Sequence, residues 1–124
     1  MISKIKLGMP YAKLLKRKKD LKTVPNEVFG FRKVLSEKIE DQAYSELIYY
    51  VDEDGEKPFY ELIVIYPDDV NVRNVATELY GPPNKDKEWW FEHPKGPAVN
   101  IWVFKQKIVI AGIISGTEWN EIDN

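Results

Sequence analysis

Residues 44–66 read YSELIYYVDEDGEKPFYELIVIY, and this stretch decides the fold. Segments 44–51 and 59–66 are rich in Tyr, Ile, Val and Leu, which favour extended strands. Between them lie residues 52–56, DEDGE, whose Asp-Gly pair is a strong turn signal between two strands. The stretch therefore predicts a β-hairpin, and with it a sheet at the centre of the chain.

Two helices are predicted, one on each side of this hairpin. Segment 10–21 starts at a proline, which suits the first turn of a helix, and its apolar residues share one broad stripe. Segment 70–80 follows residues 67–69, PDD, in which an aspartate is expected to cap the helix. Gly81 and the two prolines after it predict where this helix ends.

The remaining runs of β-branched and aromatic residues predict further strands. Short strands are expected over 29–35 and 88–92, and a closing hairpin over 99–104 and 108–114. The predicted order is helix, three strands, helix, three strands. An offset of 58 residues pairs equivalent positions in this order, namely Leu14 with Val72, Leu21 with Leu79, Pro25-Asn26 with Pro83-Asn84, and Phe31 with Trp89.

These patterns predict an α+β fold made of tandem αβββ repeats. The repeats are expected to form one antiparallel sheet with both helices packed on one face. At 124 residues the chain suits a single domain, 1–124, with halves of about 5–66 and 67–114 and a polar tail, 115–124.

Composition narrows the classes of function. The chain has no cysteine, which excludes disulfides, thiolate metal sites and a cysteine nucleophile. No apolar run approaches the roughly 20 residues that span a bilayer, and no secretory leader is seen, so we expect a cytoplasmic protein that does not enter a membrane.

Charge is distributed unevenly along the chain. Residues 1–38 carry a net charge of +8 and residues 39–124 a net charge of −10. A basic first helix could bind nucleic acid, but a pI of about 5.5 disfavours that partner. The basic residues concerned are Lys13, Lys16, Arg17, Lys19 and Lys22.

Two segments carry a family resemblance. Residues 5–9, IKLGM, before an amphipathic helix, and residues 78–83, ELYGPP, before Trp89-Trp90-Phe91, resemble repeats of the β-lactamase-inhibitor-protein-like group, which includes small outer-membrane assembly lipoproteins. The second half has residues 67–69 where that group has Gly-Met, and the chain offers no cysteine for a lipid. The resemblance implies a non-enzymatic binding module that uses an open sheet face.

No residue pattern predicts catalysis, a metal or a cofactor. His93 is the only histidine and has no partner at metal-ligand spacing. The acidic run that starts at Asp52 fails as a calcium loop, because Lys57 and Ile63 occupy its sixth and twelfth positions. Glu46 and Glu61 could form a two-carboxylate pair, although solvent-facing residues of a sheet are the commoner case. We therefore expect no enzyme.

Strand alternation separates a helix-covered face from a mixed one. The covered face should carry Leu47, Tyr49, Val51, Tyr60, Leu62, Val64, Val99, Ile101 and Val103. The mixed face should carry Tyr44, Ile48, Phe59 and Ile65 together with seven candidate binding residues. These seven are Tyr50, Glu46, Glu61, Ile63, Asn100, Trp102 and Phe104.

The leading hypothesis is a protein-binding module, such as an inhibitor, an immunity-type protein or an assembly factor, with an unidentified protein partner on the mixed face. The tail or a second copy of the chain are the alternative occupants of that face. A second hypothesis is an enzyme or small-ligand binder with a pocket near Trp89, Trp90 and His93. Nucleic-acid binding through the first helix is the third.

Overall fold

The predicted central hairpin is present in the structure, a computed structural model that describes residues 7–18, 21–23, 32–40, 42–52, 58–92, 94 and 96–114. The turn at 53–57 and the tail at 115–124 lie outside the described residues. The elements are α1 (Tyr11–Arg17), β1 (Lys22–Thr23), β2 (Arg32–Lys38), β3 (Glu46–Asp52), β4 (Phe59–Ile65), α2 (Val72–Tyr80), β5 (Trp89–Phe91), β6 (Ala98–Phe104) and β7 (Lys107–Ile113).

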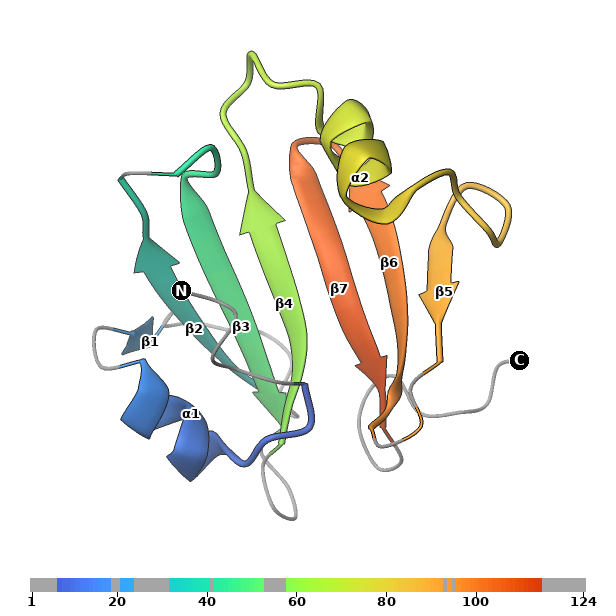
Figure 1. The fold of residues 1–124 in the computed structure, drawn as a ribbon. Helices are drawn as coiled ribbons and strands as arrows, with labels where there is room; N and C mark the ends of the chain where they lie inside the picture. Colours follow the sequence, from blue (N-terminus) through green and yellow to red (C-terminus); the bar gives the residue numbers. More distant parts are fainter. Residues whose placement is uncertain are drawn as a thin grey trace.

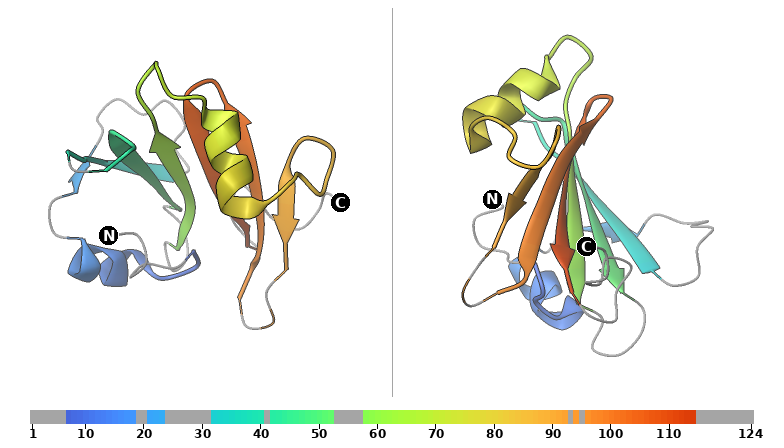
Figure 2. Two further views of the ribbon diagram at one scale, coloured as in Figure 1. Left: turned by 45° about the horizontal axis from the view of Figure 1, so that its top comes forward. Right: turned by 90° about the vertical axis from the view of Figure 1, so that its right-hand side faces the viewer.

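The strands form one sheet in the order β1-β2-β3-β4-β7-β6-β5, and all neighbours are antiparallel. Strands β4 and β7 meet in the middle, so the last strand before α2 pairs with the last described strand of the chain (Figure 1). Both helices lie on the same side of this sheet, α1 over the β2–β3 end and α2 over β6 and β7 (Figures 1 and 2). The α+β prediction with one antiparallel sheet is thus confirmed.

Helix α1 ends earlier than predicted, and α2 begins later than predicted. Helix α1 stops at Arg17, because the chain must be extended by Lys22 to pair β1 with β2. The cap of α2 is Asn71, whose side chain accepts a hydrogen bond from the backbone N–H of Asn74 at 3.1 Å, so the expectation of an aspartate cap is wrong. The end at Gly81 is confirmed, and its φ of 82° is in the region that favours glycine.

A β-bulge in the central hairpin changes which side chains reach the core. The register shifts between Tyr50 and Val51, and Tyr60 is the extra residue. Phe59 therefore joins the core, with its ring centroid 5.6 Å from that of Tyr49. The ring of Tyr60 instead packs 6.3 Å from that of Tyr50, on the opposite face. Strict alternation had predicted the reverse for Phe59 and Tyr60.

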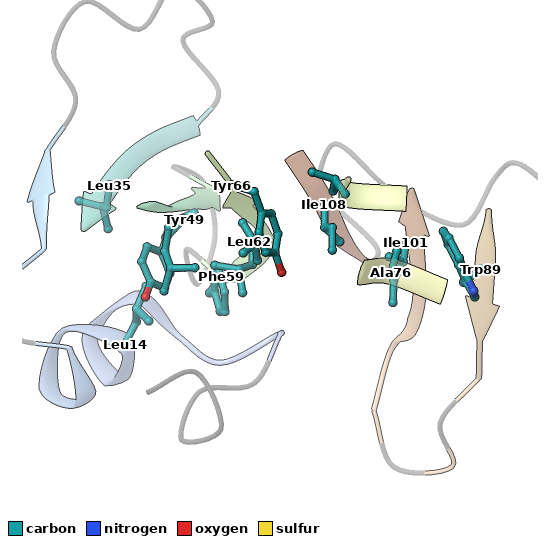
Figure 3. Close-up of a cluster of buried hydrophobic side chains, with 14 residues drawn as sticks. Leu14, Leu35, Tyr49, Phe59, Leu62, Tyr66, Ala76, Trp89, Ile101 and Ile108 are labelled. Atoms are coloured by element: carbon teal, nitrogen blue, oxygen red, sulfur yellow. The ribbon is translucent and has the colours of Figure 1, made fainter. Parts of the chain in front are cut away.

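One hydrophobic core fills the space between the helices and the sheet (Figure 3). Leu14 of α1 packs near Tyr49 and Leu35, while Ala76 of α2 lies with Trp89 and Ile101. Tyr44 also belongs to this core rather than to the mixed face, because it precedes β3 and so escapes the alternation of that strand. The remaining buried members are Leu47, Val51, Phe59, Leu62, Val64, Tyr66, Val72 and Ile108.

A buried polar cluster ties α1 to the sheet. Lys18, at the C-terminal cap of α1, is only 7% exposed and places its Nζ 3.3 Å from Oε1 of Glu37 on β2. The hydroxyl of Tyr49 on β3 donates to the same oxygen at 2.8 Å. One carboxylate thus receives a cation and a hydroxyl from two different elements, which fixes α1 relative to β2 and β3.

We expect Lys18→Ala to lower the free energy of unfolding by about 2 kcal/mol, because Glu37 would keep a mostly buried charge without its cation. Lys16→Ala is the matched control, since Lys16 is exposed on the same helix and should change stability by less than about 0.5 kcal/mol. Urea unfolding followed by tryptophan fluorescence measures both variants. Equal midpoints for the two would contradict the role assigned to Lys18.

Stability should also fall at alkaline pH. Burial raises the pKa of Tyr49, and its hydrogen bond to Glu37 raises it further. An unfolded tyrosine ionises near pH 10, so above that pH the unfolded state releases a proton that the folded state keeps. The stabilisation is complete below about pH 10 and is lost as the pH rises above it.

Tyr49→Phe should cost about 1 kcal/mol at neutral pH and weaken the alkaline decline. The decline should not vanish, because burial also raises the pKa values of Tyr66 and Tyr80. Urea midpoints of the parent and the variant at neutral pH and above pH 10 test this expectation. Parallel declines would show that Tyr49 does not carry the effect.

Candidate binding face

The sheet face that points away from both helices gathers all seven candidate binding residues. We call it the far face. Its described members include Val34, Ser36 and Lys38 of β2, Glu46, Ile48 and Tyr50 of β3, Tyr60, Glu61, Ile63 and Ile65 of β4, Lys107, Val109, Ala111 and Ile113 of β7, Ala98, Asn100, Trp102 and Phe104 of β6, and Trp90 of β5.

Cross-strand pairing arranges these residues in three rows. The middle row is apolar and crosses four adjacent strands, with Ile48, Ile63, Val109 and Trp102 as successive partners. Neighbouring strands lie about 4.8 Å apart, so this row is about 14 Å long. Its two central members, Ile63 and Val109, are buried, so the row offers apolar contact mainly through the half-buried Ile48 and Trp102 at its ends.

The two flanking rows are mixed. One row contains Tyr50, Glu61 and Asn100, and Ala111 separates the last two. The other contains Glu46 and Phe104 on either side of Ile65 and Lys107. The seven candidate residues therefore lie on one continuous surface that spans both sides of the β4–β7 junction.

Exposure varies strongly across the far face. Glu61 and Ile63, on the central strand β4, are 4% and 8% exposed, so the expectation of an open face is wrong at its centre. Glu46, Tyr50, Asn100 and Trp102 are half-buried, and Phe104 is 54% exposed. Val109 and Ala111 on β7 are buried as well. The surface available to a partner is therefore the ring of side chains around β4 and β7, with aromatic residues on β3 and β6.

The two carboxylates are too far apart for a two-carboxylate mechanism. Glu46 on β3 pairs with Ile65 on β4, whereas Glu61 on β4 pairs with Tyr50 on β3. Glu61 therefore lies four residues along the sheet from the position opposite Glu46. This register separates the two positions by about 13 Å along the strands, beyond the roughly 5 to 9.5 Å that glycosidases use. The carboxylate of Glu46 instead accepts from Nζ of Lys38 at 3.4 Å.

A polar network borders the far face at β5. The side-chain amide of Asn100 donates to Oε1 of Glu88 and to the carbonyl of Trp89, both at 3.1 Å. The indole N–H of Trp90 donates to Glu92 at 3.1 Å, and Nζ of Lys85 lies 4.4 Å from the Trp90 ring centroid. The edge of the face is thus rich in charged and hydrogen-bonding groups.

The predicted pocket near Trp89, Trp90 and His93 is found only in part. Trp89 is fully buried and donates its indole N–H to the carbonyl of Gly81 at 2.8 Å, so it lines no opening. Trp90, Asn84 and Lys85 do line an open, shallow depression of about 350 Å³. His93 lies outside the described residues.

The basic first helix offers only part of the surface that nucleic-acid binding would need. Lys13, Lys16 and Lys22 are exposed, but α1 has only seven residues. The side chain of Arg17 and all of Lys19 lie outside the described residues. On this helix, the ring of Tyr11 already has a cation of the same chain beside it, since Nζ of Lys33 lies 5.7 Å from the ring centroid.

Within the described residues, no group of three or more His, Asp or Glu side chains is placed to hold a metal ion. In that same part of the chain, neither helix is long and apolar enough to cross a bilayer.

Comparisons with protein-family models, with curated proteins and with solved structures find no match for this chain.

Proposed function

We propose that this chain is a protein-binding module whose partner contacts the far face. The observation that carries the proposal is the pair of half-buried apolar side chains Ile48 and Trp102, which lie at the two ends of an apolar row on the face without a described helix. The centre of that row, Ile63 and Val109, is buried. Half-buried Tyr50 lies in the neighbouring row. Tyrosine and tryptophan side chains such as Tyr50 and Trp102 often dominate the binding energy of protein interfaces.

The shape of this surface favours a macromolecular partner. Small ligands bind in concave sites that bury most of their surface, whereas protein interfaces are broad, with an apolar centre and a polar rim. The far face has that second composition, because Lys38, Glu46 and Lys107 border the apolar row on one side and Asn100 on the other.

The tandem αβββ relation belongs to the same proposal. Strands β4-β3-β2 and β7-β6-β5 run outward from the β4–β7 junction in matching order, and β1 adds a further strand outside β2. Helices α1 and α2 lie on opposite sides of that junction, α1 toward the β2–β3 end and α2 over β6 and β7 (Figure 1). Both features support two related halves whose last strands pair. The resemblance to the β-lactamase-inhibitor-protein-like group agrees with this proposal, since its members bind through a sheet face.

Affinity capture from the lysate of the native cells tests the proposal, with the partner identified by mass spectrometry. We expect Trp102→Ala and Tyr50→Ala each to reduce capture at least about tenfold, because the loss of a central aromatic contact costs 2 kcal/mol or more. Leu79→Ala is the matched control, since Leu79 is 60% exposed on α2, on the other side of the sheet.

Circular dichroism and urea unfolding of each variant separate lost binding from lost folding. Folded variants at Trp102 and Tyr50 that capture the same partner as the parent would refute the far-face assignment. If only the Leu79→Ala variant lost capture, the interface would instead lie on the helix side of the sheet.

A second candidate function is small-ligand binding in the depression lined by Asn84, Lys85 and Trp90. The observation in its favour is a half-buried indole beside a lysine, which suits a ligand with a planar ring and a negative charge. Titration with a library of aromatic carboxylates and phosphates, followed by tryptophan fluorescence, tests it. Binding that weakens on Lys85→Met but persists on Lys87→Met would support this site, and an unchanged spectrum throughout the library would exclude it.

A further inference from the structure

Strand β5 is the last strand at one end of the sheet in the described part of the chain. Edge strands normally present unpaired N–H and C=O groups that can pair with a strand from another chain. The sequence Trp89–Phe91 is aromatic and strongly favours strand structure, so β5 would be an effective template for such pairing.

The backbone groups of β5 alternate between the two sides of the strand. Trp89, Trp90 and Phe91 all lie opposite residues of β6. The N–H and C=O of Trp90 bond Asn84, away from β6, so by alternation the groups of Glu88 and Trp90 face outward and those of Trp89 and Phe91 face β6. All four of these outward groups are hydrogen-bonded within the chain. The partners come from a single loop that starts at Asn84.

Asn84 bonds both outward groups of Trp90 with its side chain. The backbone N–H of Trp90 donates to Oδ1 of Asn84 at 2.7 Å, and Nδ2 of Asn84 donates to the carbonyl of Trp90 at 3.1 Å. A carboxamide has the same donor and acceptor as a peptide group. Its two bonds to one residue reproduce the pattern that a neighbouring antiparallel strand would make.

The outward groups of Glu88 are closed by a tight turn. Its N–H donates to the carbonyl of Lys85, and its own carbonyl accepts from the backbone N–H groups of Asn84 and Lys85, each at 3.0 Å. Asp86 adopts a φ of 60° within this turn, a conformation that aspartate tolerates better than most residues. The loop 84–88 thus folds back along the edge of β5.

We propose that Asn84 takes the place of an outer strand beside β5 and thereby keeps this edge from pairing with a second copy of this chain. Charge supports the same outcome. An antiparallel pair of two copies centred on Trp90 would place Glu88 of one copy opposite Glu92 of the other, and like charges in that position repel. The inference is independent of the far-face proposal, because it concerns backbone groups at the sheet edge.

The test compares two variants that differ only at position 84, namely N84A/E88Q/E92Q and E88Q/E92Q. Both remove the repulsive charges, and only the first removes the carboxamide. Sedimentation velocity over a concentration series should show self-association of N84A/E88Q/E92Q, while E88Q/E92Q keeps the mass of the parent. Equal masses for two folded variants would overturn the proposal.

Amide hydrogen exchange of Trp90 verifies that the edge has been opened. We expect exchange of this amide to accelerate about tenfold in Asn84→Ala, which corresponds to the loss of one hydrogen bond. Asn84→Asp should retain slow exchange, because its carboxylate still accepts from the Trp90 N–H, and it serves if the alanine variants do not fold. Unchanged exchange in Asn84→Ala, or fast exchange in Asn84→Asp, would refute the role of Asn84.

Discussion

The antiparallel pairing of β4 with β7 is the constraint on which the rest of the structure depends. These strands pair from Glu61 with Ala111 to Ile65 with Lys107, and the pairing joins the strands before α2 to those after it. Without it there would be two small sheets, each with one short helix and too little core to be stable. With it, Leu14 of α1 and Ala76 of α2 belong to one hydrophobic cluster.

The same pairing creates the far face. Ile63 and Val109 are partners across the junction, so the apolar row continues on one face from β3 and β4 to β7 and β6. The helices lie over the opposite face, and the side chain of Asn84 together with the backbone of Asn84 and Lys85 closes the outer edge of β5. The backbone groups of Glu88 and Trp90 are thus already used, and the proposal of a partner on the far face rests on its side chains.

Local sequence patterns predicted the elements better than their connections. The Asp-Gly turn, the alternation in β3 and β4 and Gly81 after α2 are local signals, and the structure contains the hairpin and the helix end that they predict. The β-bulge at Tyr60 was missed because an extra residue leaves no mark in an alternating pattern. The burial of Lys18 and of Glu61 was missed because charged residues are usually exposed, and their positions depend on contacts between distant elements. The strand order likewise depends on pairing between distant segments. The bonds between Asn84 and the edge of β5 were also missed, because the sequence marks Asn84 only as a turn residue.

A disulfide between positions 63 and 109 tests the central claim most directly, namely that β4 and β7 pair in this register to form one continuous face. The chain has no cysteine of its own, so the variant I63C/V109C contains only the two new thiols. Facing residues of antiparallel strands lie within the Cα separation that a disulfide spans, whereas the diagonal pair in I63C/A111C is about 7 Å apart or more. The account predicts an intramolecular disulfide in I63C/V109C under mild oxidation, detected by mass spectrometry, and little in I63C/A111C. A disulfide only between chains, or a preference for I63C/A111C, would contradict it.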